Sequence, residues 1–276
     1  MPMSPDPSRA GSAAAVPAGA LRAPASSLAW REARVLLEAG RMLLPLLLPA
    51  RRSRTARART IVVLPGFGAD DRATWPLRRQ LVKSGHHAEG WGLGLNRAGI
   101  EIRHGFEDLP PSWSLEPIAQ YRGEGSVPML CERMVARLRE RHRALGGAPL
   151  TLIGWSLGGF LAREAARDLP DLVEEVITLG APVQGGPKYT RAAGFFRGRG
   201  MDLDWIERGI QRRESVPIRA RITAIVSPTD AVVGHAAAYD LHSPDVRHLE
   251  IDASHLGLCV NPTVWTLIAE TLERER

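Results

Sequence analysis

The sequence contains little that would suit a metalloprotein or a disulfide-stabilised protein. It has only two cysteines, Cys131 and Cys259, which lie far apart and in no cluster with histidine. Neither a cysteine-based metal site nor a disulfide framework is therefore indicated. We interpret both as small, mostly buried thiols, which favours a reducing compartment. We expect neither a metal nor another cofactor.

Long hydrophobic runs are also missing. The apolar run over residues 42–50 lies between arginines and is far shorter than the about 20 residues that a membrane-spanning helix requires. Residues 1–27 are rich in Pro, Ala, Ser and Gly and contain no aromatic residue. They lack the basic start and apolar core of a secretory signal. We therefore predict a disordered tail over 1–27 and a cytoplasmic location.

Lysine is nearly absent, since Lys83 and Lys188 are the only two, and arginine carries most of the positive charge. The net charge of +6 at pH 7 raises the question of a nucleic-acid partner. However, the arginines are spread over expected helices, loops and the N-terminal segment, and no stripe of arginine interleaved with aromatic residues appears. We expect no nucleic-acid partner.

Residues 28–59 form an N-terminal unit of their own. A helix is expected over 28–44, with Ser27 as its N-cap, and a leucine-rich run and a basic linker follow it. Two interpretations of the leucines remain open. They pack on the body of the protein, which we favour, or residues 28–50 make peripheral contact with a membrane, which would leave the protein cytoplasmic but peripheral to that membrane.

From residue 60 onward, short apolar runs alternate with helical patterns. The first of them, residues 61–64, is wholly apolar, as is typical of a buried parallel strand. The alternation of strands with helices predicts an α/β domain over 60–276 with helices on both faces of a mostly parallel sheet. Residues 94–125 are expected to form a long loop. The six expected strands are 61–64, 87–92, 150–154, 173–179, 221–226 and 246–251. Helices are expected at 73–84, 126–145, up to 168 after the third strand, and 262–274.

One motif carries the strongest functional signal. Residues 154–158 read Gly-Trp-Ser-Leu-Gly, which matches G-x-S-x-G between an apolar strand and a helix-forming stretch. In this context the motif forms a sharp turn that places the serine in a strained backbone conformation and exposes its hydroxyl above the sheet. The flanking glycines remove Cβ atoms that would clash there. Ser156 is therefore the expected nucleophile.

A serine hydroxyl is a weak nucleophile that needs a base, and the base needs an orienting acid. Ligand sites of parallel sheets lie at the carboxyl ends of strands. Asp230 follows the strand at 221–226 by four residues, and His255 follows the strand at 246–251 by four residues. We expect them to be the acid and the base. Three other carboxylates are less suitable as the acid. Asp202 and Asp204 are interpreted as surface charge, and Asp252 lies too close to the end of its strand.

Acyl transfer also requires donors for a developing oxyanion. One is expected to be the backbone N–H of Leu157, the residue after the nucleophile. The other is expected in the loop Pro65-Gly66-Phe67-Gly68, which directly follows the first strand. We assign this second role to the backbone N–H of Phe67.

These motifs together resemble the α/β-hydrolase superfamily, and within it small bacterial esterase- or lipase-like hydrolases. The resemblance covers residues 60–276 and rests on four stretches: 64–68, 154–159, 178–182 and 254–258. It implies a six-stranded core, as in minimal lipases, and a short cap at about 182–216. Substrate-pocket residues are expected among Trp155, Phe195, Phe196 and Trp205. The resemblance supplies no role for the N-terminal extension.

The expected activity is hydrolysis of a carboxylic ester, from a small molecule or a lipid, through an acyl-enzyme. His255 would take the proton of Ser156 and later activate water, while Asp230 would fix the imidazole tautomer. A thioesterase or an acyltransferase would use the same residues. A different class, a lipid-binding protein without turnover, would keep the fold but not need the intact triad.

Overall fold

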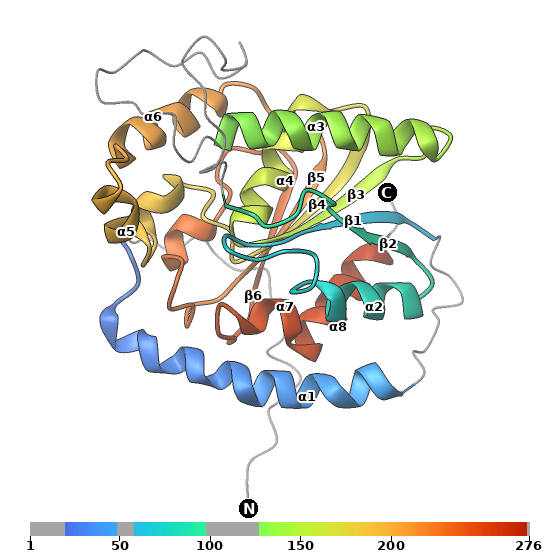
Figure 1. The fold of residues 1–276 in the computed structure, drawn as a ribbon, viewed down its shortest axis with the longest axis horizontal. Coiled ribbons are helices and arrows are strands. Elements are labelled where there is room, and N and C mark those ends of the chain that lie inside the picture. The colour runs from blue at the N-terminus through green and yellow to red at the C-terminus, as the bar shows by residue number, and fades with distance from the viewer. Residues whose placement is uncertain (1–19, 49–57, 98–126, 275–276) are drawn as a thin grey trace, which may run out of the picture.

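The computed structural model describes residues 20–48, 58–97 and 127–274. Its centre is a six-stranded, all-parallel sheet (Figure 1). The strands, in sheet order, are β2 (His87–Gly90), β1 (Thr60–Leu64), β3 (Leu150–Trp155), β4 (Val173–Leu179), β5 (Arg221–Val226) and β6 (Val246–Glu250). The predicted α/β architecture and strand number are confirmed.

The strand β2 ends earlier than its sequence suggested. The prediction extended it to residue 92, but the chain leaves the sheet after Gly90. The carboxylate of Asp71 accepts the backbone N–H of Trp91 at 3.0 Å and that of Gly92 at 3.1 Å. The backbone N–H groups of Trp91 and Gly92 are therefore not available for hydrogen bonds within the sheet.

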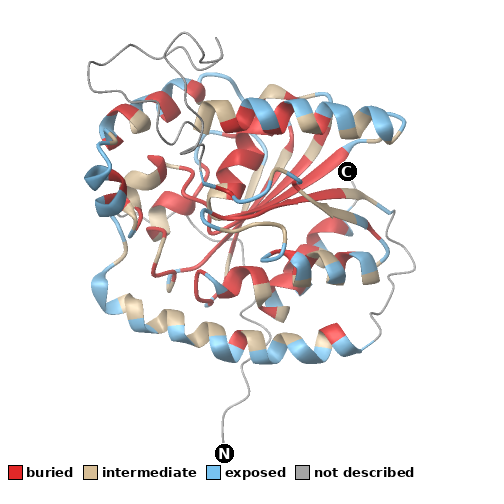
Figure 2. Ribbon diagram, viewed as in Figure 1, coloured by how far each residue is buried: buried red, intermediate tan, exposed pale blue. Residues whose placement is uncertain are grey.

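Alternating side chains divide the core into two layers. Val62 and Leu64 of β1 belong to one apolar cluster, which α3 (Val127–Ala144) and α4 (Leu157–Asp168) cover. Ile61 and Val63 belong to the other, which α2 (Trp75–Lys83), α7 (Gly257–Val260) and α8 (Pro262–Leu272) cover. Period-two alternation thus buries both faces of the sheet (Figure 2).

The N-terminal unit forms a further helical layer outside α2, α7 and α8 (Figure 1). It begins as a 3-10 helix, η2 (Ser26–Arg34), and continues as α1 (Val35–Leu47). Leu46 and Met42 pack into the second apolar cluster. The ammonium group of Lys83 donates hydrogen bonds to the carbonyl oxygens of Pro45 at 3.2 Å and Leu48 at 2.8 Å. The C-terminus of α1 is therefore fastened to α2.

The start of this helix differs from the prediction. Ser27 was expected as the N-cap, but Ala25 occupies that position, and its carbonyl accepts the N–H of Leu28 at 3.0 Å. Of the predicted tail 1–27, residues 20–27 are described, and Leu21 packs against a cluster that includes Tyr239. Residues 1–19 and most of the predicted loop 94–125 lie outside the described residues.

The predicted cap segment between β4 and β5 contains helices that the sequence did not reveal. They are η5 (Gly186–Tyr189), α5 (Ala193–Gly198) and α6 (Leu203–Arg213). A further 3-10 helix, η6 (His235–Ala238), follows β5.

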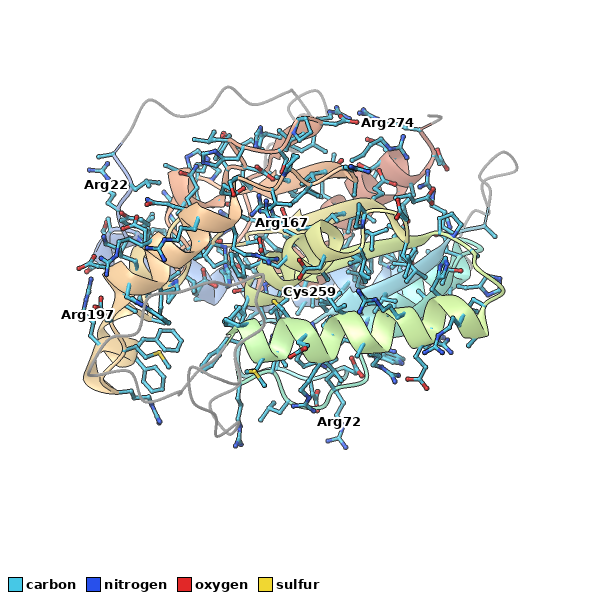
Figure 3. All side chains as sticks on the ribbon, turned by 90° about the horizontal axis from the view of Figure 1, so that it is seen from above. Arg22, Arg72, Arg167, Arg197, Cys259 and Arg274 are labelled. Atoms are coloured by element: carbon cyan, nitrogen blue, oxygen red, sulfur yellow. The ribbon has the colours of Figure 1, made fainter. Side chains whose placement is uncertain are left out.

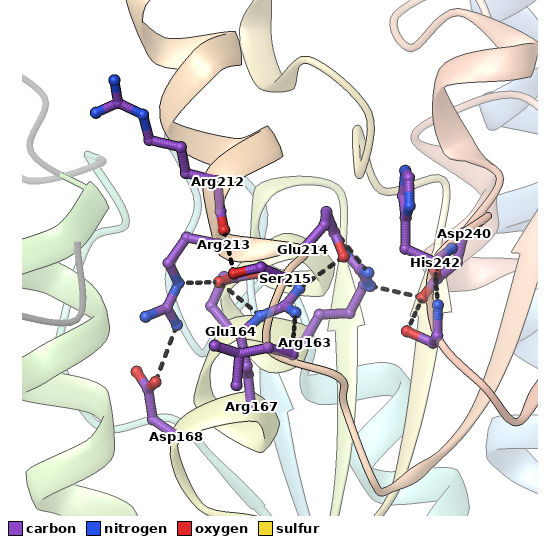
Figure 4. A network of polar contacts seen from close by, with 12 residues as sticks. Arg163, Glu164, Arg167, Asp168, Arg212, Arg213, Glu214, Ser215, Asp240 and His242 are labelled. Atoms are coloured by element: carbon purple, nitrogen blue, oxygen red, sulfur yellow. Dashed lines mark hydrogen bonds and ion pairs between the residues drawn. The ribbon is translucent and has the colours of Figure 1, made fainter. Parts of the chain in front are cut away.

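Buried ion pairs tie α6 to α4 (Figure 4). Glu164 of α4 accepts from Arg213 of α6 at 2.7 Å, and Arg163 pairs with Asp240 at 2.9 Å.

The arginines of these ion pairs are buried. Arg167 lies in the interior of the molecule, whereas Arg72, Arg197 and Arg274 reach its rim (Figure 3). Burial acts to raise the pKa of Glu164, but Arg167, Arg213 and Arg163 outweigh burial and lower it. The cap is therefore anchored by charge as well as by apolar packing.

The structure describes helices within the ranges 20–48, 58–97 and 127–274. None of these helices combines the length and the hydropathy needed to cross a bilayer.

Candidate active site

The motif predicted to form a sharp turn does so. Ser156 lies between β3 and α4 with φ 56° and ψ −125°, and it is the only non-glycine residue with positive φ among the described residues. A Cβ on Gly154 would lie 2.3 Å from the carbonyl oxygen of Gly158, and one on Gly158 would lie 2.4 Å from that of Leu64. Both positions therefore require glycine, which explains the spacing of the motif.

Backbone contacts place this turn beside the predicted acid and base. The N–H of Ser156 donates to the carbonyl of Leu179, at the end of β4, at 2.9 Å. The next residue, Gly180, has positive φ, and a Cβ there would lie 2.9 Å from Asp230 Oδ2 and 3.4 Å from His255 Nδ1. The carboxyl ends of β3, β5 and β6 thus converge around the end of β4.

Asp230 and His255 form a buried pair. Their Oδ2 and Nδ1 atoms lie 2.7 Å apart, and the two side chains are 3% and 4% exposed. The other carboxylate oxygen, Oδ1, accepts the backbone N–H groups of Val232 at 2.7 Å and Val233 at 2.8 Å. Because an ionised carboxylate only accepts hydrogen bonds, the neutral imidazole in this position carries its proton on Nδ1 and leaves Nε2 as an acceptor. This is the tautomer that a general base needs.

The segment 252–261, here called the histidine loop, is held by residues of η2 and α1, which together form the N-terminal helix. Oε1 of Glu32 accepts the backbone N–H of His255 at 2.9 Å and that of Ala231 at 3.2 Å, while Oε2 accepts that of Leu256 at 3.3 Å. One carboxylate therefore joins the loop of the acid to the loop of the histidine. No sequence motif marks Glu32.

A second carboxylate of the same helix reinforces this attachment. Glu38 is 3% exposed, and its Oε1 accepts the N–H of Ser254 at 3.2 Å and the side-chain amide of Asn261 at 3.4 Å. The Ser254 hydroxyl donates to its Oε2. Arg34 forms an ion pair with Asp252 at 2.8 Å. On the inner side, the indole N–H of Trp155 donates to the carbonyl of His255 at 3.0 Å.

The loop at 65–68 lies against the serine turn. A Cβ on Gly66 would lie 3.1 Å from the Cβ of Ser156. Asn96 is buried and fixes the loop. Its side-chain amide donates to the backbone carbonyl of Pro65 at 2.7 Å, and its backbone carbonyl accepts the N–H of Gly68 at 2.6 Å. Phe67 therefore lies in a loop of fixed shape beside Ser156, and Leu157 begins α4.

Three phenylalanines gather next to this loop. The ring centroid of Phe67 lies 5.3 Å from that of Phe196 and 6.4 Å from that of Phe195, in edge-to-face arrangements. Phe67 and Phe195 remain 36% and 49% exposed. The cap residues Phe195 and Phe196 thus meet the loop that carries Phe67, and they offer an apolar surface there.

The two tryptophans named as candidate pocket residues are both buried. Trp155 is buried in the apolar cluster beneath the histidine loop, and its ring centroid lies 5.8 Å from that of His255. Trp205 is buried on α6, where its backbone N–H donates to Asp202 at 2.9 Å.

The carboxylates that were set aside all have structural partners. Asp202 caps the N-terminus of α6, Asp204 pairs with Lys188 at 2.6 Å, and Asp252 pairs with Arg34. In the described ranges, no group of three or more His, Cys, Asp or Glu side chains is arranged to hold a metal ion.

A parallel sheet whose carboxyl edge presents a strained serine turn and a buried Asp–His pair defines a hydrolase of the α/β type. The sequence model of one family, described as alpha/beta hydrolase fold, matches residues 43–202. This match spans more than half of the chain, and the protein belongs to that family.

Solved structures with a similar fold include lipolytic enzymes. A lipase from Bacillus licheniformis superimposes with a TM-score of 0.51 at 15% identity, covering 82% of this chain and 95% of that one. A structure from work on two metagenome-derived lipolytic enzymes gives 0.51 at 13% identity, covering 82% and 100%. A hydrolase from Oleispira antarctica gives 0.50 at 12% identity, covering 79% and 92%. At these identities the likeness concerns the fold alone.

Proposed function

We propose that this protein is a serine hydrolase that cleaves carboxylic esters through an acyl-enzyme intermediate. The observation that carries the proposal is the buried 2.7 Å contact between His255 Nδ1 and Asp230 Oδ2, at the sheet edge where Ser156 adopts its strained conformation. A structural Asp–His pair alone would not require a strained serine at the same edge, because such strain persists mainly where function demands it.

In the proposed reaction, Nε2 of His255 takes the proton of the Ser156 hydroxyl as its oxygen attacks the acyl carbon. The carbon–oxygen bond to the alcohol then breaks, and the imidazolium returns the proton to the departing alcohol. In the second half, His255 takes a proton from water, the hydroxide adds to the acyl carbon, and Ser156 leaves with the proton. Asp230 stabilises the imidazolium in both halves.

The oxyanion formed in each half would be bound by the backbone N–H groups of Phe67 and Leu157. Two features support this assignment. Gly66 brings the loop within contact of Ser156, and Asn96 fixes the shape of the loop. Preorganised donors of this kind are worth about 3–4 kcal/mol of transition-state stabilisation each.

The phenylalanine cluster Phe67, Phe195 and Phe196 supports a substrate with an apolar acyl or alcohol part. Aromatic rings that remain half exposed at a site lose their contact with water when such a group binds. A thioesterase or an acyltransferase would use the same serine, histidine and aspartate. Ester, thioester and alcohol-acceptor assays on the same preparation separate these three activities.

The test combines a fluorophosphonate probe with p-nitrophenyl esters of graded acyl length. We expect the probe to label Ser156 and the wild-type protein to hydrolyse the esters. Ser156→Ala should lose both, whereas Ser215→Ala, which changes an exposed serine of the cap, should lose neither. Labelling or turnover that survives in Ser156→Ala would refute the serine mechanism. An unlabelled wild-type protein with an intact fold would favour a lipid-binding protein without turnover.

A further inference from the structure

The side of α1 that faces away from the protein is built of leucine. The five leucines are between 58% and 81% exposed. They are Leu36, Leu37, Leu43, Leu44 and Leu47, here called the leucine face. Their spacing of i, i+1, i+7, i+8 and i+11 places them on one face of the helix. A contiguous exposed apolar surface of this kind marks an interaction site.

Contacts on the opposite side of α1 fix the direction in which the leucine face points. On the opposite side of α1, Glu38 is buried against the histidine loop and Leu46 is buried in the core. Lys83 binds the carbonyl groups at the C-terminal end of the helix. The outer surface of the N-terminal helix is accordingly exposed or half-buried along its length (Figure 2).

The exposed charges that η2 and α1 themselves carry are positive. Within residues 20–48 the only carboxylates are Glu32 and Glu38, and both accept hydrogen bonds from the histidine loop. Arg41 is exposed beside the leucines. At the N-terminal end, Trp30 is 68% exposed with the guanidinium of Arg31 5.5 Å from its ring.

We propose that the leucine face docks on the surface of a membrane that contains anionic lipids. An apolar helix face bordered by arginine and an exposed tryptophan is the pattern of a helix that lies in the membrane interface. The leucines would enter the acyl boundary, and Arg41, Arg31 and Trp30 would lie at the level of the headgroups.

The same charges disfavour a second copy of this chain as the occupant. Arg41 lies next to the midpoint of the leucine face, which spans residues 36–47. A two-fold axis through that midpoint would bring Arg41 close to its own copy, and neither helix offers an exposed carboxylate to neutralise the pair. An anionic lipid surface neutralises the arginine instead.

The test is co-sedimentation of the full chain with vesicles of phosphatidylcholine alone or with about 30% phosphatidylglycerol. We expect binding to the anionic vesicles that weakens with salt. The double variant Leu37→Gln, Leu44→Gln should bind at least about tenfold more weakly, and Arg41→Gln about fivefold more weakly to anionic vesicles only. The matched control is Leu241→Gln, Val216→Gln, which changes two apolar residues that are 49% and 53% exposed elsewhere.

Two further measurements separate the other outcomes. Hydrolysis of a short p-nitrophenyl ester should be equal in wild type and Leu37→Gln, Leu44→Gln, which shows that the variant is folded. Light scattering after gel filtration gives the oligomeric state of both. A wild-type dimer that the variant converts to a monomer, without vesicle binding, would show that a second copy covers the face. Equal vesicle binding by wild type and the leucine variant, or no binding by either, would also overturn the proposal.

Discussion

The carboxylate of Glu32 accepts the backbone N–H of His255 at 2.9 Å, although 223 residues separate the two in the chain. The same carboxylate accepts the N–H of Ala231, next to Asp230, at 3.2 Å. An N-terminal helix therefore joins the loops of the proposed acid and the proposed base. The extension for which the sequence suggested no catalytic role is part of the scaffold of the site.

Glu32→Ala should lower kcat for ester hydrolysis by about 10- to 100-fold with a smaller change in KM, since small misplacements of catalytic groups have effects of this size. Glu32→Gln keeps one carbonyl acceptor and should restore part of the activity. The control is Glu132→Ala, on the exposed side of α3. Steady-state kinetics of the three variants measure kcat and KM for comparison with the wild type. An unchanged kcat in Glu32→Ala would show that the histidine loop does not need this contact.

Glu38→Ala should destabilise the fold by about 2–4 kcal/mol, because it leaves three donors of Ser254 and Asn261 without their acceptor and each unsatisfied buried group costs about 1–3 kcal/mol. Glu270→Ala, an exposed position on α8, serves as the control. Urea unfolding measures both. A loss no larger than that of the control would mean that water replaces the carboxylate.

Asp230→Asn should lower kcat by several orders of magnitude, because an amide favours the wrong imidazole tautomer. Asp202→Asn should have kcat close to that of the wild type, since asparagine also caps helices well and Asp202 caps α6. If the two variants behave alike in ester hydrolysis, the assignment of the acid fails.

Ser156→Gly should be more stable than Ser156→Ala. Positive φ at a non-glycine residue stores about 1–3 kcal/mol of strain, while the greater unfolded-state entropy of glycine offsets about 0.4–1 kcal/mol. The net gain of about 1 kcal/mol corresponds to a rise of about 2–4 °C in melting temperature for a protein of this size. Calorimetry on the two inactive variants provides the comparison. A lower melting temperature for the glycine variant would mean that Ser156 is not strained.

Acid should destabilise the protein through its buried carboxylates. Burial acts to raise the pKa of Asp240, but Arg163 and hydrogen bonds from Ser243 and His242 outweigh burial and lower it. A depressed pKa gives stability that is present above the unfolded-state value of about 3.9 and is lost as pH falls through the folded-state value. Asp240→Asn should therefore unfold more easily at pH 7 and lose less stability between pH 5 and 3.

The matched control for this experiment is Asp171→Asn, at an exposed position before β4. The free energy of unfolding, measured in urea at several pH values, should keep its wild-type pH dependence in that variant. An Asp240→Asn curve parallel to that of the wild type would show that the ion pair with Arg163 does not contribute to acid sensitivity.

The sheet, the serine turn and the candidate acid and base could be predicted from the amino-acid sequence. Short runs rich in valine, isoleucine and threonine favour buried strands, and β4 and β5 were predicted with their observed bounds. The glycines of the turn are dictated by steric clashes within a few residues, and such clashes leave a local signature. Asp230 and His255 could be found because the carboxyl ends of parallel strands meet at one edge of the sheet.

The contacts of the N-terminal helix and the anchoring of the cap could not be predicted in this way, because they are made between segments that are distant in the chain. Glu32 and Glu38 bind backbone groups more than 190 residues away, and a carboxylate on an amphipathic helix normally faces solvent. The partners of Arg163 and Arg213 likewise come from segments distant in the chain. Such contacts depend on how the packed layers meet in space, so neither the periodicity nor the spacing of residues reveals them. The contacts of Glu38 and Leu46 on the inner side of α1 likewise determine which way the leucine face points.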